Sequence, residues 1–158
     1  MENTKNYDMS EYRNKIMHAI VSNENMVRLL EEDPTGHPED TIPYSKAYPY
    51  EYIPDEAAES GKYISFELHA TTDERNKLFK SITVSFFILC HADEVRTAKG
   101  LWYDSVSCEL ENVFAGGNLG IGKTSFISNI AYAPNKKFKG RLLSFAVKEL
   151  QYGISNGT

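Results

Sequence analysis

Two neighbouring stretches of the chain alternate strictly between apolar and polar residues. The apolar sets are Ile64, Phe66, Leu68 and Ala70 in the first stretch, and Ile82, Val84, Phe86, Ile88 and Cys90 in the second. A period of two predicts strands with one buried face. Only a short polar linker separates the two stretches, which predicts an antiparallel hairpin. The second stretch is apolar on both faces at Phe87 and Leu89, which places it centrally in a sheet.

A second hairpin is predicted near the C-terminus. Its strands run from about Thr124 to Ala133 and from about Lys139 to Leu150. The residues between them, Pro134-Asn135-Lys136-Lys137, are of the types that form turns. In the last strand Leu143, Phe145 and Val147 share one face, and we expect that face to pack against the core.

Helical spacing marks two further parts of the chain. Near the N-terminus the apolar residues on one helical face are Tyr12, Ile16, Ala19 and Ile20. Asp8 or Ser10 can cap this helix, Ser22 is expected to cap a second one, and Pro34 ends it. In the middle of the chain Trp102, Val106, Leu110 and Val113 form one stripe. This helix should stop at Ala115-Gly116-Gly117.

Residues 34–60 are rich in proline and tyrosine. The prolines are Pro34, Pro38, Pro43, Pro49 and Pro54, and the tyrosines between them are Tyr44, Tyr48, Tyr50 and Tyr52. Proline cannot donate to a strand ladder, which excludes a central strand and leaves an edge strand or a long extended arm. Long irregular segments in compact domains are often functional.

The order of elements predicts the fold class. Helices, an arm, a hairpin, a helix and a hairpin indicate an α+β fold, with a mainly antiparallel sheet of two hairpins and two helices packed on it. Its 158 residues fit a single domain. Within 1–158 we expect an N-terminal helical part (1–30), the extended arm (34–60), a ββαββ core (61–150) and a frayed tail (151–158).

Composition and residue spacing argue against several classes of function. The net charge of −5 argues against a protein that grips nucleic acid through phosphate contacts. Cys90 and Cys108 lack zinc-like spacing to each other or to histidine, so we expect no metal. No apolar run is long enough to span a membrane, and the N-terminus lacks the apolar core of a secretory signal, so we expect a protein that stays in the cytosol. Nothing pairs a nucleophile with a base, and we expect neither enzyme activity nor a cofactor.

One string is a literal nucleotide-binding motif. Residues Gly117 to Thr124 match GxxxxGK[ST] at every fixed position. A working phosphate loop needs a strand before it and a helix after it. Here the predicted helix precedes the string and a predicted strand follows it. We therefore interpret the string as a flexible glycine-rich connector, with nucleotide binding through Lys123 and Thr124 as the alternative.

The layout is similar to that of a known class of proteins. The segments that carry this likeness are Lys15–Val21, Val27–Leu30, Ile42–Tyr44, Pro49–Pro54, Lys80–His91, Gly100–Leu110 and Arg141–Leu150. In their order and in the kinds of residue they contain, they resemble the tail-terminator and head–tail joining (neck) proteins of long-tailed bacteriophages. The resemblance covers most of the chain and rests on layout rather than on an invariant motif.

This resemblance implies a non-enzymatic virion subunit, assembled in the bacterial cytoplasm and located at the tail or neck. It implies a hexameric ring that joins the tail tube protein to the head–tail connector protein, with DNA passing through the lumen without specific binding. Terminator, stopper and completion factor all stay open. The residues expected at subunit or partner contacts are Tyr44, Tyr48, Tyr50, Tyr52, Gly117, Gly120, Gly122 and Lys123. A host-directed binding module, with the tyrosines as its recognition surface, is a further alternative.

Overall fold

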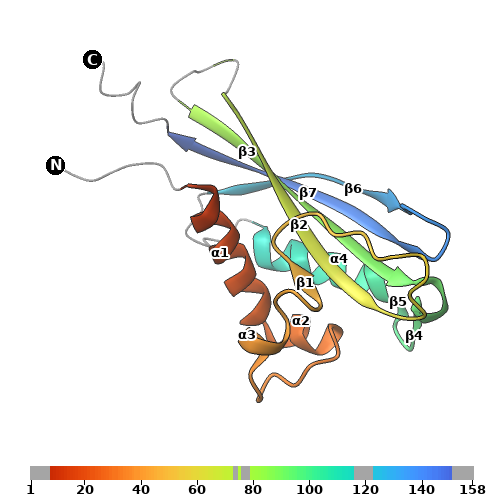
Figure 1. The fold of residues 1–158 in the computed structure, drawn as a ribbon. Coiled ribbons are helices and arrows are strands. Elements are labelled where there is room, and N and C mark those ends of the chain that lie inside the picture. Colours follow the sequence, from red (N-terminus) through yellow and green to blue (C-terminus); the bar gives the residue numbers. More distant parts are fainter. Residues whose placement is uncertain (1–7, 73–74, 76–78, 116–122, 151–158) are drawn as a thin grey trace, which may run out of the picture.

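The protein is described here by a computed structural model that covers residues 8–72, 75, 79–115 and 123–150. Its helices are α1 (Met9–Val21), α2 (Glu24–Leu29), α3 (Pro38–Thr41) and α4 (Trp102–Phe114), with a short 3₁₀ turn at Ala92–Glu94. Its strands are β1 (Ala47–Tyr48), β2 (Lys62–Thr72), β3 (Phe79–His91), β4 (Arg96–Thr97), β5 (Gly100–Leu101), β6 (Thr124–Tyr132) and β7 (Phe138–Leu150). These elements form the α+β fold that the sequence predicts (Figure 1).

One five-stranded sheet organises the molecule, in the order β1-β2-β3-β7-β6. Both predicted hairpins are present, because β2 pairs antiparallel with β3 and β6 pairs antiparallel with β7. The two hairpins join where β3 pairs antiparallel with β7. The central position predicted for β3 is therefore confirmed. β1 is a two-residue edge strand parallel to β2, which agrees with the proline content of its segment.

The helices cover one face of this sheet, which we call the inner face. Its buried side chains alternate along β2, β3 and β7, as the period-two pattern predicts. They pack in a single core with apolar residues of α1, α2 and α4. Among the described residues no helix is long and apolar enough to cross a membrane.

The helix caps differ from expectation at one position. Asp8 caps α1 by accepting a hydrogen bond from the Glu11 amide, which settles the choice between Asp8 and Ser10. The prediction that Ser22 caps the next helix is wrong, because Asn23 is the cap and accepts from the Met26 amide at 2.9 Å. The reason is that Ser22 still closes α1, where its amide bonds the His18 carbonyl.

The proline-tyrosine segment folds back across the other face of the sheet, which we call the outer face. The amide of Tyr52 donates to the Ser65 hydroxyl of β2 at 3.1 Å. At the far side of the sheet the Asn135 side-chain amide donates to the Pro54 carbonyl at 3.2 Å. The segment therefore crosses from β2 to the turn between β6 and β7. This crossing explains why Phe87 and Leu89, on the outer face of β3, are buried.

Candidate assembly surfaces

Five tyrosines form a cluster beside β1 and the start of β2. They are Tyr44, Tyr48, Tyr50, Tyr52 and Tyr63, which we call the tyrosine cluster. Tyr48 is its centre: its ring stacks on that of Tyr52, with centroids 3.9 Å apart, and only 9% of the residue is exposed. Burial, followed by its hydrogen bond with Tyr52, raises the pKa of Tyr48 to about 12.

The four tyrosines nominated from the sequence thus lie together, and they divide into two roles. Tyr48 and Tyr52 hold the segment against its own sheet. Tyr44 and Tyr50 are the outward members, and Tyr44 is 64% exposed. Tyr44 also adopts a positive φ of 64°, in a turn where its amide bonds the Ala47 carbonyl. A left-handed backbone is uncommon for tyrosine and costs about 1 kcal/mol or more, so this turn presents a large aromatic ring to solvent at some expense in stability.

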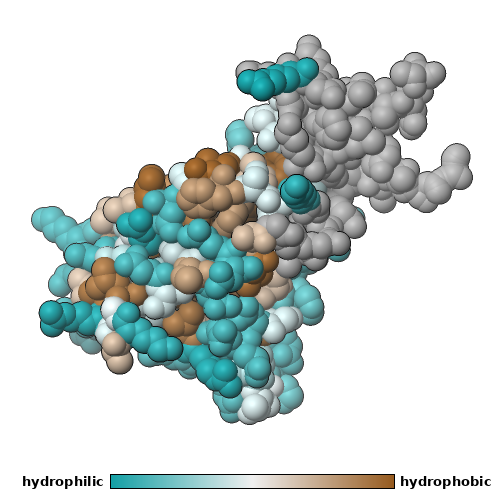
Figure 2. All heavy atoms as spheres, turned by 180° about the vertical axis from the view of Figure 1, so that it is seen from behind, coloured by the Kyte–Doolittle hydropathy of each residue, from teal (hydrophilic) through white to brown (hydrophobic). Residues whose placement is uncertain are grey.

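The second surface is the edge strand β6. Three of its large apolar side chains are about half exposed: Phe126 at 55%, Ile127 at 49% and Ile130 at 54%. No charged residue and no proline occurs from Thr124 to Ala133. β6 is the last strand of the sheet, so its outer edge pairs with no other strand among the described residues. Apolar surface gathers along the part of Figure 2 where β6 runs.

Natural edge strands usually carry lysine, proline or a bulge that discourages pairing with other chains. β6 has a register irregularity between Phe126 and Ser128, but it runs regularly from Ser128 to Tyr132. This second half has no charged residue of its own, although the Asn129 carbonyl accepts a hydrogen bond from the Arg141 guanidinium of β7 at 3.2 Å. Sequence patterns identified β6 as a strand but not as an assembly surface. The available signal was its ten-residue stretch without a charge.

The glycine-rich string lies mostly outside the described residues, which exclude Gly117, Gly120 and Gly122. Its two ends are described. α4 ends before the string at Phe114, and β6 begins after it at Thr124. This is the reverse of the strand-loop-helix order that a phosphate loop requires. The Thr124 hydroxyl is buried and donates to the Phe114 carbonyl, so it is not available to hold Mg²⁺. Lys123 is exposed at the start of β6.

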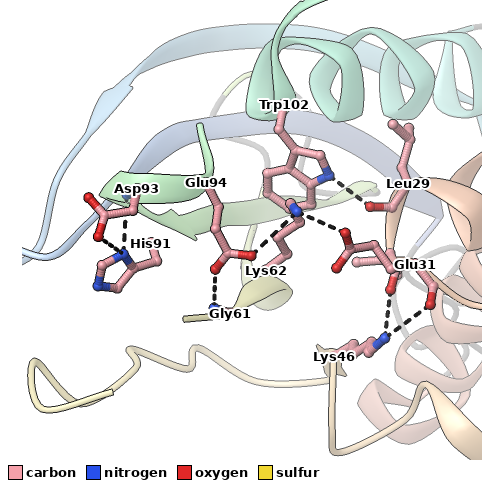
Figure 3. Close-up of polar contacts among 10 residues, drawn as sticks. Leu29, Glu31, Lys46, Gly61, Lys62, His91, Asp93, Glu94 and Trp102 are labelled. Carbon is pink, nitrogen blue, oxygen red and sulfur yellow. Dashed lines mark hydrogen bonds and ion pairs between the residues drawn. The ribbon is translucent and has the colours of Figure 1, made fainter. Parts of the chain in front are cut away.

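A group of ion pairs fastens the proline-tyrosine segment and β2 to the helices (Figure 3). Lys62 Nζ lies 3.0 Å from Glu31 Oε2 and 3.5 Å from Glu94 Oε2. Burial alone would lower the pKa of Lys62, but the two carboxylates raise it above its ordinary value. Lys46 Nζ lies 2.7 Å from a Glu32 carboxylate oxygen and 2.8 Å from the Leu30 carbonyl. A cavity of about 160 Å³ is lined by Lys46, Lys62, Glu31 and Glu94 among others. Both of its lysines are already paired, so the group is structural.

One exposed group in the described part of the chain has the spacing of metal ligands. His37, Glu39 and Asp40 place their ligand atoms within 4.8 Å of one another at the start of α3. All three are exposed, and no buried side chain completes the set. Nothing else in the structure assigns a metal to this position.

Fold and surfaces together define a class: an α+β domain whose sheet ends in an uncharged exposed strand and carries an aromatic cluster at its opposite side. A protein-family model, described as YomW, matches residues 23–147. The match covers most of the chain, which therefore belongs to the YomW family, a phage-associated family. No curated protein matches the chain.

Proposed function

We propose that this chain is a structural subunit of a phage particle. In this proposal it forms a ring at the neck, as a tail terminator or tail-completion protein, and joins the tail tube to the head connector. Two observations support the proposal, the phage-associated family and the α+β fold with its antiparallel sheet. The order of segments along the chain also resembles that of neck proteins. The role is mechanical, and it needs no catalytic group or cofactor.

The exposed edge of β6 carries this proposal. A free monomer leaves three apolar side chains about half exposed on an edge strand without charged residues, and such an edge promotes unwanted pairing. A subunit that assembles covers these side chains and satisfies the edge hydrogen bonds with a neighbour. Heterologous contacts of this kind close into rings when the rotation between subunits closes.

The tyrosine cluster supplies the second contact in this proposal. Tyr44 and Tyr50 present large rings from a segment that Tyr48 and Tyr52 hold on the sheet. Tyrosine is enriched at interfaces because it offers much contact area for few rotatable bonds. We assign this surface to the tail tube protein or the connector protein. With a net charge of −5, a ring would let DNA pass through its lumen with little adhesion.

The direct test is to look for the chain in purified particles of the phage that encodes it. Mass spectrometry of purified particles and of separated tails should find the chain at a few copies per particle, enriched in the tail or neck fraction. Absence from particles, together with capture of a host protein that depends on Tyr44 and Tyr50, would overturn the proposal in favour of a host-directed module.

The nucleotide-binding alternative has a test of its own. Calorimetry with millimolar MgATP or MgGTP is expected to give no binding heat, and Lys123→Ala should behave as the wild-type chain does. The buried Thr124 hydroxyl is the physical reason, because a phosphate loop needs that hydroxyl on the metal. Binding heat that Lys123→Ala removes would restore the alternative.

A further inference from the structure

We propose that Tyr44 and Tyr50 receive an arginine-bearing segment of a partner protein. These two rings, together with the carboxylates of Asp40 and Glu51, form what we call the tyrosine-acid surface. The inference rests on the proposed function, in which the tyrosine cluster contacts the tail tube protein or the connector protein. It adds the chemistry by which that partner is recognised.

The two rings are exposed and already positioned. Their centroids lie 6.3 Å apart with planes inclined by 48°, and 64% of Tyr44 and 44% of Tyr50 are exposed. Behind them Tyr48 packs against both rings, at centroid distances of 6.5 Å and 5.8 Å. Because Tyr48 also stacks on Tyr52, the rings are backed by a layer that is fixed to the sheet. A partner therefore orders little of this surface when it binds, which favours affinity.

Two exposed carboxylates lie next to these rings. Glu51 directly follows Tyr50, and it accepts a hydrogen bond from the Tyr132 hydroxyl that leaves its negative charge in place. Asp40 belongs to α3, whose last carbonyl accepts a hydrogen bond from the residue after Tyr44. Neither carboxylate forms an ion pair with a cation in the described part of the chain.

The positive charges around the cluster are already neutralised. Three cations lie beside it, and each has a carboxylate partner: Lys46 with Glu32, Lys62 with Glu31 and Glu94, and Arg13 with Glu67. Residues 31–60 as a whole contain nine carboxylates and one lysine. The surface is therefore negative, and a cationic partner complements it.

Arginine suits this surface better than lysine. A guanidinium group stacks on tyrosine rings and donates paired hydrogen bonds to a carboxylate, whereas an ammonium group is a compact, strongly hydrated charge. One arginine side chain can therefore use a ring and a neighbouring carboxylate together. An acidic segment would meet like charge, and a purely apolar one would remove Asp40 and Glu51 from water without a partner.

Fluorescence anisotropy with the full chain tests the inference. The probe is a short labelled peptide in which arginine alternates with serine, and matched peptides carry lysine or glutamate in place of arginine. Tyr44→Leu/Tyr50→Leu removes both rings, and Tyr44→Phe/Tyr50→Phe keeps them. Asp40→Asn and Glu51→Gln each remove one charge next to the rings. The matched control, Asp104→Asn, removes one exposed charge beside β7, on the other side of the sheet. Thermal unfolding checks that each variant folds.

We expect the arginine peptide to bind most tightly, the lysine peptide several times more weakly, and the glutamate peptide not at all. Each lost ring should weaken binding by about twofold to fivefold, the usual range for an exposed cation–π contact. The phenylalanine variant and Asp104→Asn should bind like the wild type. Asp40→Asn and Glu51→Gln should weaken binding and make it less sensitive to salt. Equal affinity for the arginine and lysine peptides, or a leucine variant that binds like the wild type, would overturn the inference.

A second measurement identifies the segment that the surface contacts in the particle. The full chain, with a photoreactive benzoylphenylalanine in place of Tyr50, is irradiated with purified tails and connectors, and mass spectrometry locates the cross-link. We expect it next to an arginine of the tail tube protein or the connector protein. A cross-link to a segment without arginine, or to a second copy of this chain, would overturn the inference and leave the proposed function standing. A chain that binds the arginine peptide but is absent from particles would refute the proposed function and retain the arginine site.

Discussion

Replacing Ile130 by lysine should separate folding from assembly. Ile130 lies in the regular half of β6 and is 54% exposed in the single chain. Full burial of an isoleucine side chain contributes about 1.5–3 kcal/mol, so covering the exposed half contributes about 0.8–1.6 kcal/mol to each contact. That free energy corresponds to about a fourfold to fifteenfold change in the association constant. A lysine at the same place adds the cost of removing an ammonium group from water.

The assay is sedimentation velocity of wild-type and Ile130→Lys chains over a range of concentrations, with thermal unfolding of each. We expect the variant to need at least tenfold more protein to assemble, while its free energy of unfolding changes by less than about 0.5 kcal/mol, as is usual for surface sites. Asn14→Lys makes the same charge change at an exposed position on α1 and should assemble normally. An Ile130→Lys chain that assembles like the wild type would refute the reasoning about β6.

Three further predictions concern the single chain. Folding raises the pKa of Tyr48 from 10 to about 12. The contribution of the neutral Tyr48 hydroxyl to the free energy of unfolding is therefore at its full value below pH 10. That stability, about 2–3 kcal/mol, is lost as the pH rises from 10 to 12, and Tyr48→Phe should show a shallower loss in urea melts over this range. Iodoacetamide should label one thiol, Cys108, in the native chain and a second, Cys90, only after unfolding, because Cys90 is buried and its pKa is raised to about 11. Gly140→Ala should destabilise the fold by several kcal/mol or prevent folding, because the added carbon would lie 1.6 Å from the Ile88 carbonyl oxygen; circular dichroism and solubility would show it.

Most of the local helices and strands can be predicted from the sequence. The two hairpins and α4 follow from period-two and helical spacing, since those patterns record which side chains face the core. Their predicted bounds fall within about three residues of the observed ones. The cap of α2 could not be separated from its neighbour, because Ser22 and Asn23 are both good capping residues and only the end of α1 decides between them.

Long-range placement could not be predicted in the same way. The prolines of residues 34–60 exclude a central strand, but they do not say where the segment goes. Its path is fixed by distant contacts, such as Tyr52 with Ser65 and Pro54 with Asn135. The exposed edge of β6 depends on the order of strands, and that order follows from the pairing of β3 with β7, which lie far apart in the chain.

Electron microscopy and native mass spectrometry of the purified wild-type chain, alone and with tail tubes, test the central claim most directly. We predict closed rings of a single size, expected to contain six copies, that disappear for Ile130→Lys and persist for Asn14→Lys. A chain that stays monomeric at every concentration, and that never binds to tail tubes or connectors, would contradict the account.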